Sequence, residues 1–333
     1  FGYNKTYYVN ADAGLFLDAA NAAFPAITGT NTWRLSTKTS GPATPTTSTG
    51  LTNLTIGLDG AGDFATFQGA ADWVPQNNTL KRTFNVLPGI YRDYLCLRQS
   101  RNNIAFIGTG ASRTNAQLIY LYPSGSSAAT MSITTSDIYV RNLTVDNKVY
   151  QTNNGVVFAG PINTVFTAGN RIIFDNTLLK GGQDTLYANS GTAYYYRSEI
   201  WGSVDFIYGD QMAVFDQCDI VEIRSSGGPI TAPSTPYAQP YGEVFLNCNF
   251  PRALIANGYP YDVGTSTTTF QRPWRQDGMT AVINCSLGSQ FTTKGWAEWD
   301  GRETTCRARE VGSTQIGGGT VTPAQRQAAG AYW

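Results

Sequence analysis

One short pattern of apolar and polar positions recurs along the chain. Each copy has an apolar residue, a variable residue, a polar residue, a small or sulfur-containing residue and a final apolar residue. The copies are FDNTLL (174–179), YYRSEI (195–200), FDQCDI (215–220), FLNCNF (245–250) and VINCSL (282–287), so their starts step by 21, 20, 30 and 37 residues. A self-similar period of this size predicts a solenoid built one coil at a time, with loops inserted in the longer coils.

We therefore expect an all-β fold, a right-handed parallel β-helix with short capping helices. Its coils should stack at about 4.8 Å, the ordinary distance between strands. Residues 51–333 are expected to form this solenoid with a C-terminal cap, and residues 1–50, which lack the repeat, an N-terminal extension packed on it. Short helices are predicted at 14–25, 66–74 and 322–329, the last two covering the solenoid ends.

The cysteines follow the repeat. Cys218, Cys248 and Cys285 occupy one place in three of the copies, and Thr177 and Ser198 fill that place in the two before. Stacked coils would put these side chains in one column, so we expect buried thiols, with a bridge between neighbouring coils as the alternative. No spacing is typical of a metal site, and we expect neither a metal nor a cofactor.

Two strings carry the candidate chemistry. GGQDTLY (181–187) and GSVDFIYG (202–209) place Asp184 and Asp205 21 residues apart, in a chain without histidine. A mechanism that needs an imidazole is thereby excluded. Carboxylates on neighbouring coils raise one pKa of the pair, which predicts one acid and one nucleophile. The alternative is that both strings are only turns, where Asp and Gly are common.

These strings resemble motifs of the pectin methylesterases, carbohydrate esterases that remove methyl groups from homogalacturonan. QDTLY and DFIYG match the two aspartate motifs of that family, with DFIYG for the commoner DFIFG. Further matches, in one consistent order, are QRPW (271–274) with LGRPW, GWAEWDG (295–301) with GWxEW, the opening at 59–75 and PGIYRDYL (88–95) with GxYxE. The resemblance covers roughly residues 54–301.

The resemblance implies a role for each matched residue. Asp205 is the expected nucleophile, and Asp184 the acid that protonates methanol and then the base that activates water. Gln183 is expected to donate to the oxyanion. Arg272 is expected to hold Asp205 ionised through charge-assisted hydrogen bonds.

Substrate contacts are predicted for Trp274, Trp296 and Tyr208, whose aromatic faces suit sugar rings. The family's second oxyanion glutamine, in a QAVAL-like motif, has no direct counterpart. Asn154 falls near its place in the stretch 151–160, and we expect Asn154, Gln151 or a backbone amide to substitute.

Composition fits a secreted protein. Only 14% of the residues are charged, against about 25% in ordinary proteins, and the formal net charge is zero. No apolar segment is long enough to be a membrane span or a targeting segment. We expect an extracellular monomer that modifies cell-wall pectin, without nucleic-acid or membrane partners, and N-glycosylated at Asn4, Asn53 and Asn77.

Three other functions stay open. A glycosidase could use paired carboxylates at about 5 Å. A pectate lyase would need an acidic calcium cluster, for which Asp216, Asp219 and Glu222 are the nearest candidates. The third is a catalytically weak or silent wall-binding protein. Gln183 and the QRPW match favour the esterase.

Overall fold

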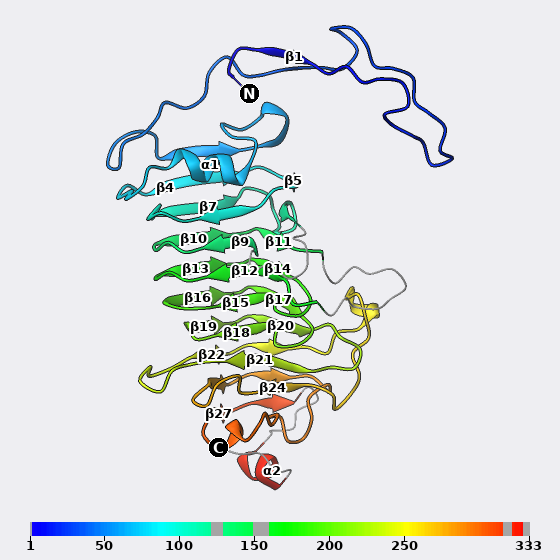
Figure 1. Cartoon of the computed structure of the whole chain (residues 1–333). Helices are drawn as coiled ribbons and strands as arrows, with labels where there is room; N and C mark the ends of the chain where they lie inside the picture. Colours follow the sequence, from blue (N-terminus) through cyan, green and yellow to red (C-terminus); the bar gives the residue numbers. More distant parts are fainter. Residues whose placement is uncertain (1, 121–128, 149–159, 316–321, 329–333) are drawn as a thin grey trace.

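The computed structural model describes residues 2–120, 129–148, 160–315 and 322–328. Three long sheets of parallel strands wind into a right-handed β-helix whose coils stack along one axis (Figure 1). The N-terminal segment and helix α1 lie at one end, and helix α2 lies at the other. The predicted fold class is confirmed.

Apart from a two-stranded antiparallel sheet near the N-terminus, the strands of the described residues fall into three parallel sheets. The first holds β3 (Asn53–Ile56), β4 (Arg82–Val86), β7 (Ile104–Gly108), β10 (Ile138–Arg141), β13 (Ile172–Asp175), β16 (Thr192–Tyr196), β19 (Met212–Asp216), β22 (Glu243–Leu246), β25 (Met279–Ile283) and β27 (Arg307–Val311). The second holds β5 (Gly89–Tyr91), β8 (Ala116–Ile119), β11 (Thr144–Asp146), β14 (Leu178–Lys180), β17 (Glu199–Gly202), β20 (Asp219–Glu222), β23 (Asn249–Phe250), β26 (Ser286–Leu287) and β28 (Thr314–Gln315). The third holds β6 (Leu95–Leu97), β9 (Ala129–Ile133), β12 (Asn163–Thr167), β15 (Leu186–Ala188), β18 (Ile207–Gly209), β21 (Pro229–Pro233) and β24 (Thr269–Gln271).

The first residues of four of the repeated segments form an aromatic column inside the β-helix. Phe174 pairs with Tyr195, Tyr195 with Phe215, and Phe215 with Phe245 in the first sheet. Their ring centroids lie 5.1, 4.6 and 4.7 Å apart, and the rings are nearly parallel. These side chains are buried, so each added coil extends one continuous apolar core.

The polar third position of the repeat makes the corner between the first and second sheets. All five residues there have a left-handed backbone, with φ of 51°, 49°, 53°, 54° and 53° for Asn176, Arg197, Gln217, Asn247 and Asn284. Asparagine is the non-glycine residue that tolerates this conformation best, which explains three of the five. Each copy of the repeat therefore specifies a corner of the coil as well as a strand.

The predicted column of small residues is also present. The Thr177 and Ser198 hydroxyls lie 2.9 Å apart, and the Cys248 N–H donates to the Cys285 sulfur at 3.4 Å. Cys218, Cys248 and Cys285 are buried free thiols, as expected. All five cysteines lie in the described ranges, and none forms a disulfide there.

Two helices lie where the sequence places them. Helix α1 (Phe67–Trp73) begins after Thr66, whose hydroxyl accepts from the Gly69 N–H at 3.0 Å. Helix α2 (Pro323–Ala328) is anchored by the buried Arg326, which donates to Glu310 at 2.9 Å. Short 3-10 helices are η1 (Leu58–Gly60), η3 (Ile255–Asn257) and η4 (Arg302–Thr304). No helix in the described ranges combines the length and apolarity that a membrane crossing requires.

The helix predicted at 14–25 is wrong, because this segment is the tip of an antiparallel ribbon. The ribbon is closed by β1 (Thr6–Tyr8) and β2 (Arg34–Ser36) and continues through a Leu17–Ala23 bridge. At its tip the Asp18 carboxylate accepts from the Ala20 and Ala22 N–H groups at 2.8 and 2.9 Å. Such an Asp-centred turn competes with helix formation.

The ribbon extends away from the β-helix, and the first coil follows the ribbon in the chain (Figure 1). The carbonyl of Thr47 accepts from the Thr79 N–H at 2.9 Å, and Arg82 donates to the Thr46 and Thr49 carbonyls at 2.6 and 2.9 Å. The domain boundary at residue 50 stays a prediction.

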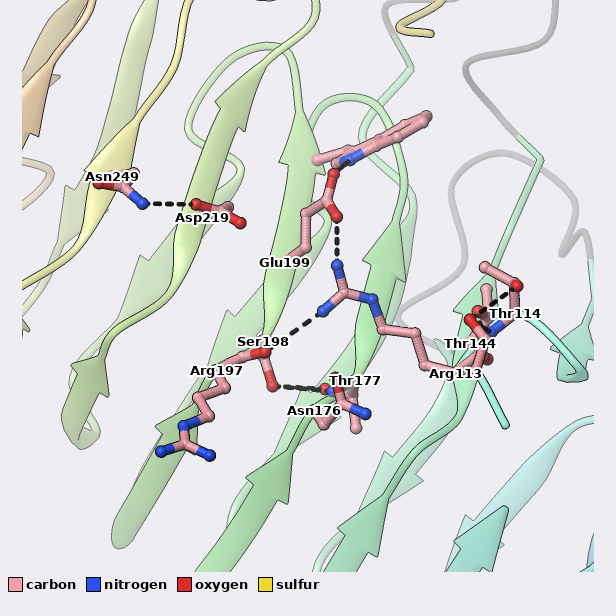
Figure 2. A network of polar contacts seen from close by, with 12 residues as sticks. Arg113, Thr114, Thr144, Asn176, Thr177, Arg197, Ser198, Glu199, Asp219 and Asn249 are labelled. Atoms are coloured by element: carbon pink, nitrogen blue, oxygen red, sulfur yellow. Dashed lines mark hydrogen bonds and ion pairs between the residues drawn. The ribbon is translucent and has the colours of Figure 1, made fainter. Parts of the chain in front are cut away.

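Polar contacts on the outer face connect both distant and neighbouring coils. Figure 2 shows Arg113, from the turn before β8, forming an ion pair with Glu199 of β17 and donating to the Arg197 carbonyl at 3.2 Å. On the same sheet the Asn249 amide donates to Asp219 at 3.0 Å. These contacts add lateral cross-links to the ladder hydrogen bonds.

Two glutamates are enclosed near the aspartates. Glu222 and Glu243 are 0% and 1% exposed, and each has one carboxyl oxygen without a hydrogen-bond partner in the described structure. Burial raises the pKa of both carboxyls well above the ordinary value of 4.5. Burial therefore favours the neutral form of both.

Neutral buried glutamates predict a pH-dependent stability. Their contribution is fully present below pH 4.5, the unfolded value, and is lost as the pH rises toward the folded pKa. Glu222→Gln and Glu243→Gln should therefore raise the melting temperature at pH 8 but not at pH 4. Melting curves across this range test it, with the exposed Glu298→Gln as a control that should show no such trend. An equal change in melting temperature at pH 4 and pH 8 would contradict burial of these glutamates in the neutral form.

Candidate active site

Asp184 and Asp205 stand at corresponding places of neighbouring coils. Leu186 pairs with Ile207 and Tyr187 with Tyr208, and each aspartate lies two residues before the first of these partners. Both aspartates have a left-handed backbone, with φ of 65° and 49°. The chain turns there from the second sheet into the third, and backbone strain of this kind concentrates at functional sites.

Arg272 holds the Asp205 carboxylate. Its Nε donates to Oδ1 at 2.8 Å and to Oδ2 at 3.0 Å, and its Nη2 also bonds Oδ2. The Asp205 side chain is only 10% exposed. Burial raises the pKa of Asp205, whereas the guanidinium hydrogen bonds and positive charge lower it. Charge-assisted bonds of this geometry favour an ionised, oriented carboxylate.

Asp184 has the opposite character. Burial, and next the negative charge of Asp205, raise its pKa from 3.8 to about 7, although Arg272 and a hydrogen bond from Gln183 act in the other direction. Burial thus raises both pKa values, and Arg272 opposes this most directly at Asp205, an asymmetry that suits Asp205 as the carboxylate and Asp184 as the proton donor. The different protonation expected for the two aspartates stays a prediction.

A row of aromatic side chains crosses the coils beside the aspartates. Tyr187 and Tyr208 stack with centroids 4.3 Å apart, and Tyr208 meets the edge of Trp274 at 5.9 Å. Phe166 extends the row at 5.2 Å from Tyr187. The structure therefore brings Tyr208 and Trp274 together, as expected for neighbouring substrate contacts.

The expected substrate contact of Trp296 is wrong. Trp296 is 1% exposed and packs against Phe270 at 5.1 Å, so its ring belongs to the core. Sequence reasoning missed Trp299, three residues later in the same GWAEWDG segment. The Arg272 guanidinium lies over the Trp299 ring, 4.2 Å from its centroid, in a cation–π contact.

Trp299 is therefore expected to position Arg272. Trp299→Ala should lower kcat about tenfold with a small change in KM, because a cation–π contact contributes about 1–2 kcal/mol when shielded from water. Trp299→Phe keeps an aromatic face and should lose less. Steady-state kinetics on a methyl-esterified substrate test this. An alanine variant with unchanged kcat would show that Asp205 alone orients the guanidinium.

Sequence reasoning also missed Asn163. Its side chain is 6% exposed, and its Oδ1 accepts the Tyr208 hydroxyl at 2.9 Å. The signal was available, because the step of 21 residues from Asp205 to Asp184, taken once more, arrives at Asn163. The expected substitutes Asn154 and Gln151 lie outside the described residues.

The acidic cluster considered for calcium does not form a binding site. Asp216 accepts the Tyr194 hydroxyl at 2.6 Å, Asp219 accepts from Asn249, and Glu222 is buried. In the described part of the chain, no three Asp, Glu or Cys side chains gather in a way that could hold a metal ion. The protein is therefore a parallel β-helix protein. Its candidate chemistry rests on two paired aspartates and the guanidinium that binds one of them.

Comparison with known proteins gives this class a name. The pectinesterase family model matches residues 53–322, and the chain belongs to the pectinesterase family. It is 30% identical over 278 residues to probable pectinesterase/pectinesterase inhibitor 64 of Arabidopsis thaliana, covering 76% of this chain and 44% of that protein. The chain thus spans less than half the length of this relative.

Solved structures show the same fold. The pectin methylesterase from carrot superposes with a TM-score of 0.70 at 24% identity, over 81% of this chain and 85% of that one. The pectin methylesterase from Aspergillus niger gives 0.68 at 25% identity, over 84% and 87%. Both lie within the range expected for members of one fold.

Proposed function

We propose that the protein is a pectinesterase that hydrolyses the methyl esters of homogalacturonan to methanol and free carboxylates. The observation that carries this is the unequal aspartate pair: Arg272 binds the Asp205 carboxylate directly, whereas burial and the charge of Asp205 raise the pKa of Asp184 to about 7. Membership of the pectinesterase family and the aromatic row beside the pair support it. No cofactor is part of the proposal.

The first half-reaction uses the carboxylate as nucleophile. A carboxylate oxygen of Asp205 attacks the ester carbonyl carbon, and the Gln183 amide donates to the oxygen that becomes negative. The tetrahedral intermediate collapses when the bond to the methoxy oxygen breaks. Asp184 gives its proton to that oxygen, so that methanol leaves and an acyl anhydride with Asp205 remains.

The second half-reaction restores both aspartates. Asp184, now ionised, takes a proton from water as the water oxygen attacks the acyl carbon of the anhydride. The bond to the Asp205 oxygen breaks, which releases the galacturonate carboxyl and regenerates the Asp205 carboxylate. A pKa of about 7 suits Asp184 for both roles, since neither form is strongly disfavoured near neutral pH.

The proposal extends to substrate and location. Tyr208 and Trp274 would contact sugar rings of the polymer, next to the ester that reacts at Asp205. The neutral net charge suits an ester-rich, weakly charged polymer. We further propose a secreted, monomeric protein acting on cell-wall pectin, glycosylated at Asn4, Asn53 and Asn77.

Product analysis tests the reaction. The protein is incubated with highly methylesterified pectin while methanol, chain length and unsaturated chain ends are followed together. Methanol with intact chains is the expected result. Shortened chains without methanol would replace the proposal by a glycosidase, unsaturated ends by a lyase, and no product by a silent wall-binding protein.

A further inference from the structure

The Tyr208 hydroxyl is held by a residue two coils away. Tyr208 lies on β18, which follows β15 and β12 in the third sheet, and its hydroxyl donates to Asn163 of β12 at 2.9 Å. The phenol ring stacks on Tyr187 of the intervening β15 with centroids 4.3 Å apart. The side chain therefore crosses the coil that carries Asp184.

An irregularity in β12 explains how Asn163 reaches an outward-facing phenol. The Thr185 carbonyl accepts from both the Thr164 and the Val165 N–H groups, each at 2.9 Å. Two residues of one strand thus oppose one of its partner, as in a β-bulge, which re-aims the adjacent side chain. Val165 remains in the core, whereas the Asn163 amide meets the Tyr208 hydroxyl.

Asp184 is the competing acceptor for this hydroxyl, because it belongs to the intervening coil that the Tyr208 side chain crosses. Burial, and next the negative charge of Asp184, raise the pKa of Tyr208. A phenol has one O–H and can donate one strong hydrogen bond. In the structure the Asn163 oxygen receives it, and no hydrogen bond joins Tyr208 to Asp184.

We propose that Asn163 is a positioning residue that holds the Tyr208 hydroxyl on its amide oxygen and away from Asp184, so that Asp184 remains a proton donor. A hydroxyl that donated to Asp184 would favour its ionised form and remove the acid. The proposal rests on the proposed function for the role of Asp184, although the protonation of Asp184 can be measured without any activity.

The other groups around Asp184 are independent of Asn163. Asp205 raises its pKa, while Arg272 and the Gln183 amide lower it. Tyr187, on the strand that follows Asp184, stacks on Tyr208 with its own ring; burial and then Asp210 raise its pKa, and Arg275 lowers it. Removing the Asn163 side chain leaves all of these in place, so a change in Asp184 would report the freed phenol.

The experiment titrates Asp184 by NMR in protein with carbon-labelled aspartate, assigned with Asp184→Asn. In Asn163→Val the freed hydroxyl should lower the Asp184 pKa by about one pH unit, a tenfold change in the ratio of its two forms. The high-pH limb of kcat should move down equally, because activity that needs protonated Asp184 is lost at a lower pH. Asn163→Ala serves as a second variant if the valine protein does not fold.

Double variants identify the group responsible. Adding Tyr208→Phe to Asn163→Val removes the hydroxyl but keeps the ring, and it should return the Asp184 pKa to the parent value or above. The matched control, Tyr187→Phe in the same background, should leave the lowered value unchanged. An Asn163 variant with the parent pKa, or a fall that persists without the Tyr208 hydroxyl, would overturn the proposal. Absence of methanol from the parent protein would refute the esterase function while leaving this titration interpretable.

Discussion

Asp205→Ala should lower methanol release about 10⁴-fold or more, as removal of a catalytic nucleophile does in other hydrolases that form acyl intermediates. The loss should appear in kcat, because Arg272 binds no other carboxylate in the described structure. Methanol release from saturating pectin measures this effect.

The melting temperature of this variant should change little. The Arg272 side chain is 32% exposed, so water can solvate its charge when the partner is removed. Asp219→Ala is the matched control, because Asp219 lies on the next coil and bonds only Asn249 in the described residues. Near-normal turnover of Asp205→Ala would remove Asp205 from the mechanism, and an equal loss in Asp219→Ala would point to misfolding.

The solenoid was predictable because its core repeats in the sequence. Phe174, Tyr195, Phe215 and Phe245 occupy one place of the pattern and stack in one column. The step that aligns them also aligns Asp184 with Asp205, so the candidate catalytic pair follows from the coil length. Each coil forms the same hydrogen-bond ladder with its neighbours. Residues one coil length apart in the sequence therefore lie next to one another in space.

Prediction failed where a residue depends on contacts outside the repeat. The segment 14–25 has helical composition, but the Asp18 turn and the ribbon pairing decide its structure. In GWAEWDG, Trp296 turns into the core and Trp299 onto Arg272, and the sequence contains no signal for which tryptophan does which. The coil step of 21 residues leads to Asn163, but the bulge that aims its amide at the Tyr208 hydroxyl leaves no sign in the sequence.

Arg272→Ala should lower kcat about 100-fold or more at pH 6. Without the guanidinium, burial acts on Asp205 alone, and its pKa rises further above 3.8. The nucleophile is the ionised form, so each pH unit by which the pKa exceeds the working pH costs about tenfold in rate. The deficit should therefore shrink as the pH rises, until deprotonation of Asp184, whose pKa also rises when the positive charge of Arg272 is removed, ends the recovery.

The pH dependence separates this role from a general loss of positive charge. The low-pH limb of kcat should move to higher pH in Arg272→Ala and less in Arg272→Lys, which keeps the charge but not the two-nitrogen contact. Arg275→Ala removes an exposed arginine that lies over Trp274 and should leave this limb in place. The Arg272→Ala protein should also lose stability as the pH rises from 5 to 8, since a carboxyl with a raised folded pKa stabilises the fold only while it is protonated. A low-pH limb that did not move would mean that something other than Arg272 keeps Asp205 ionised.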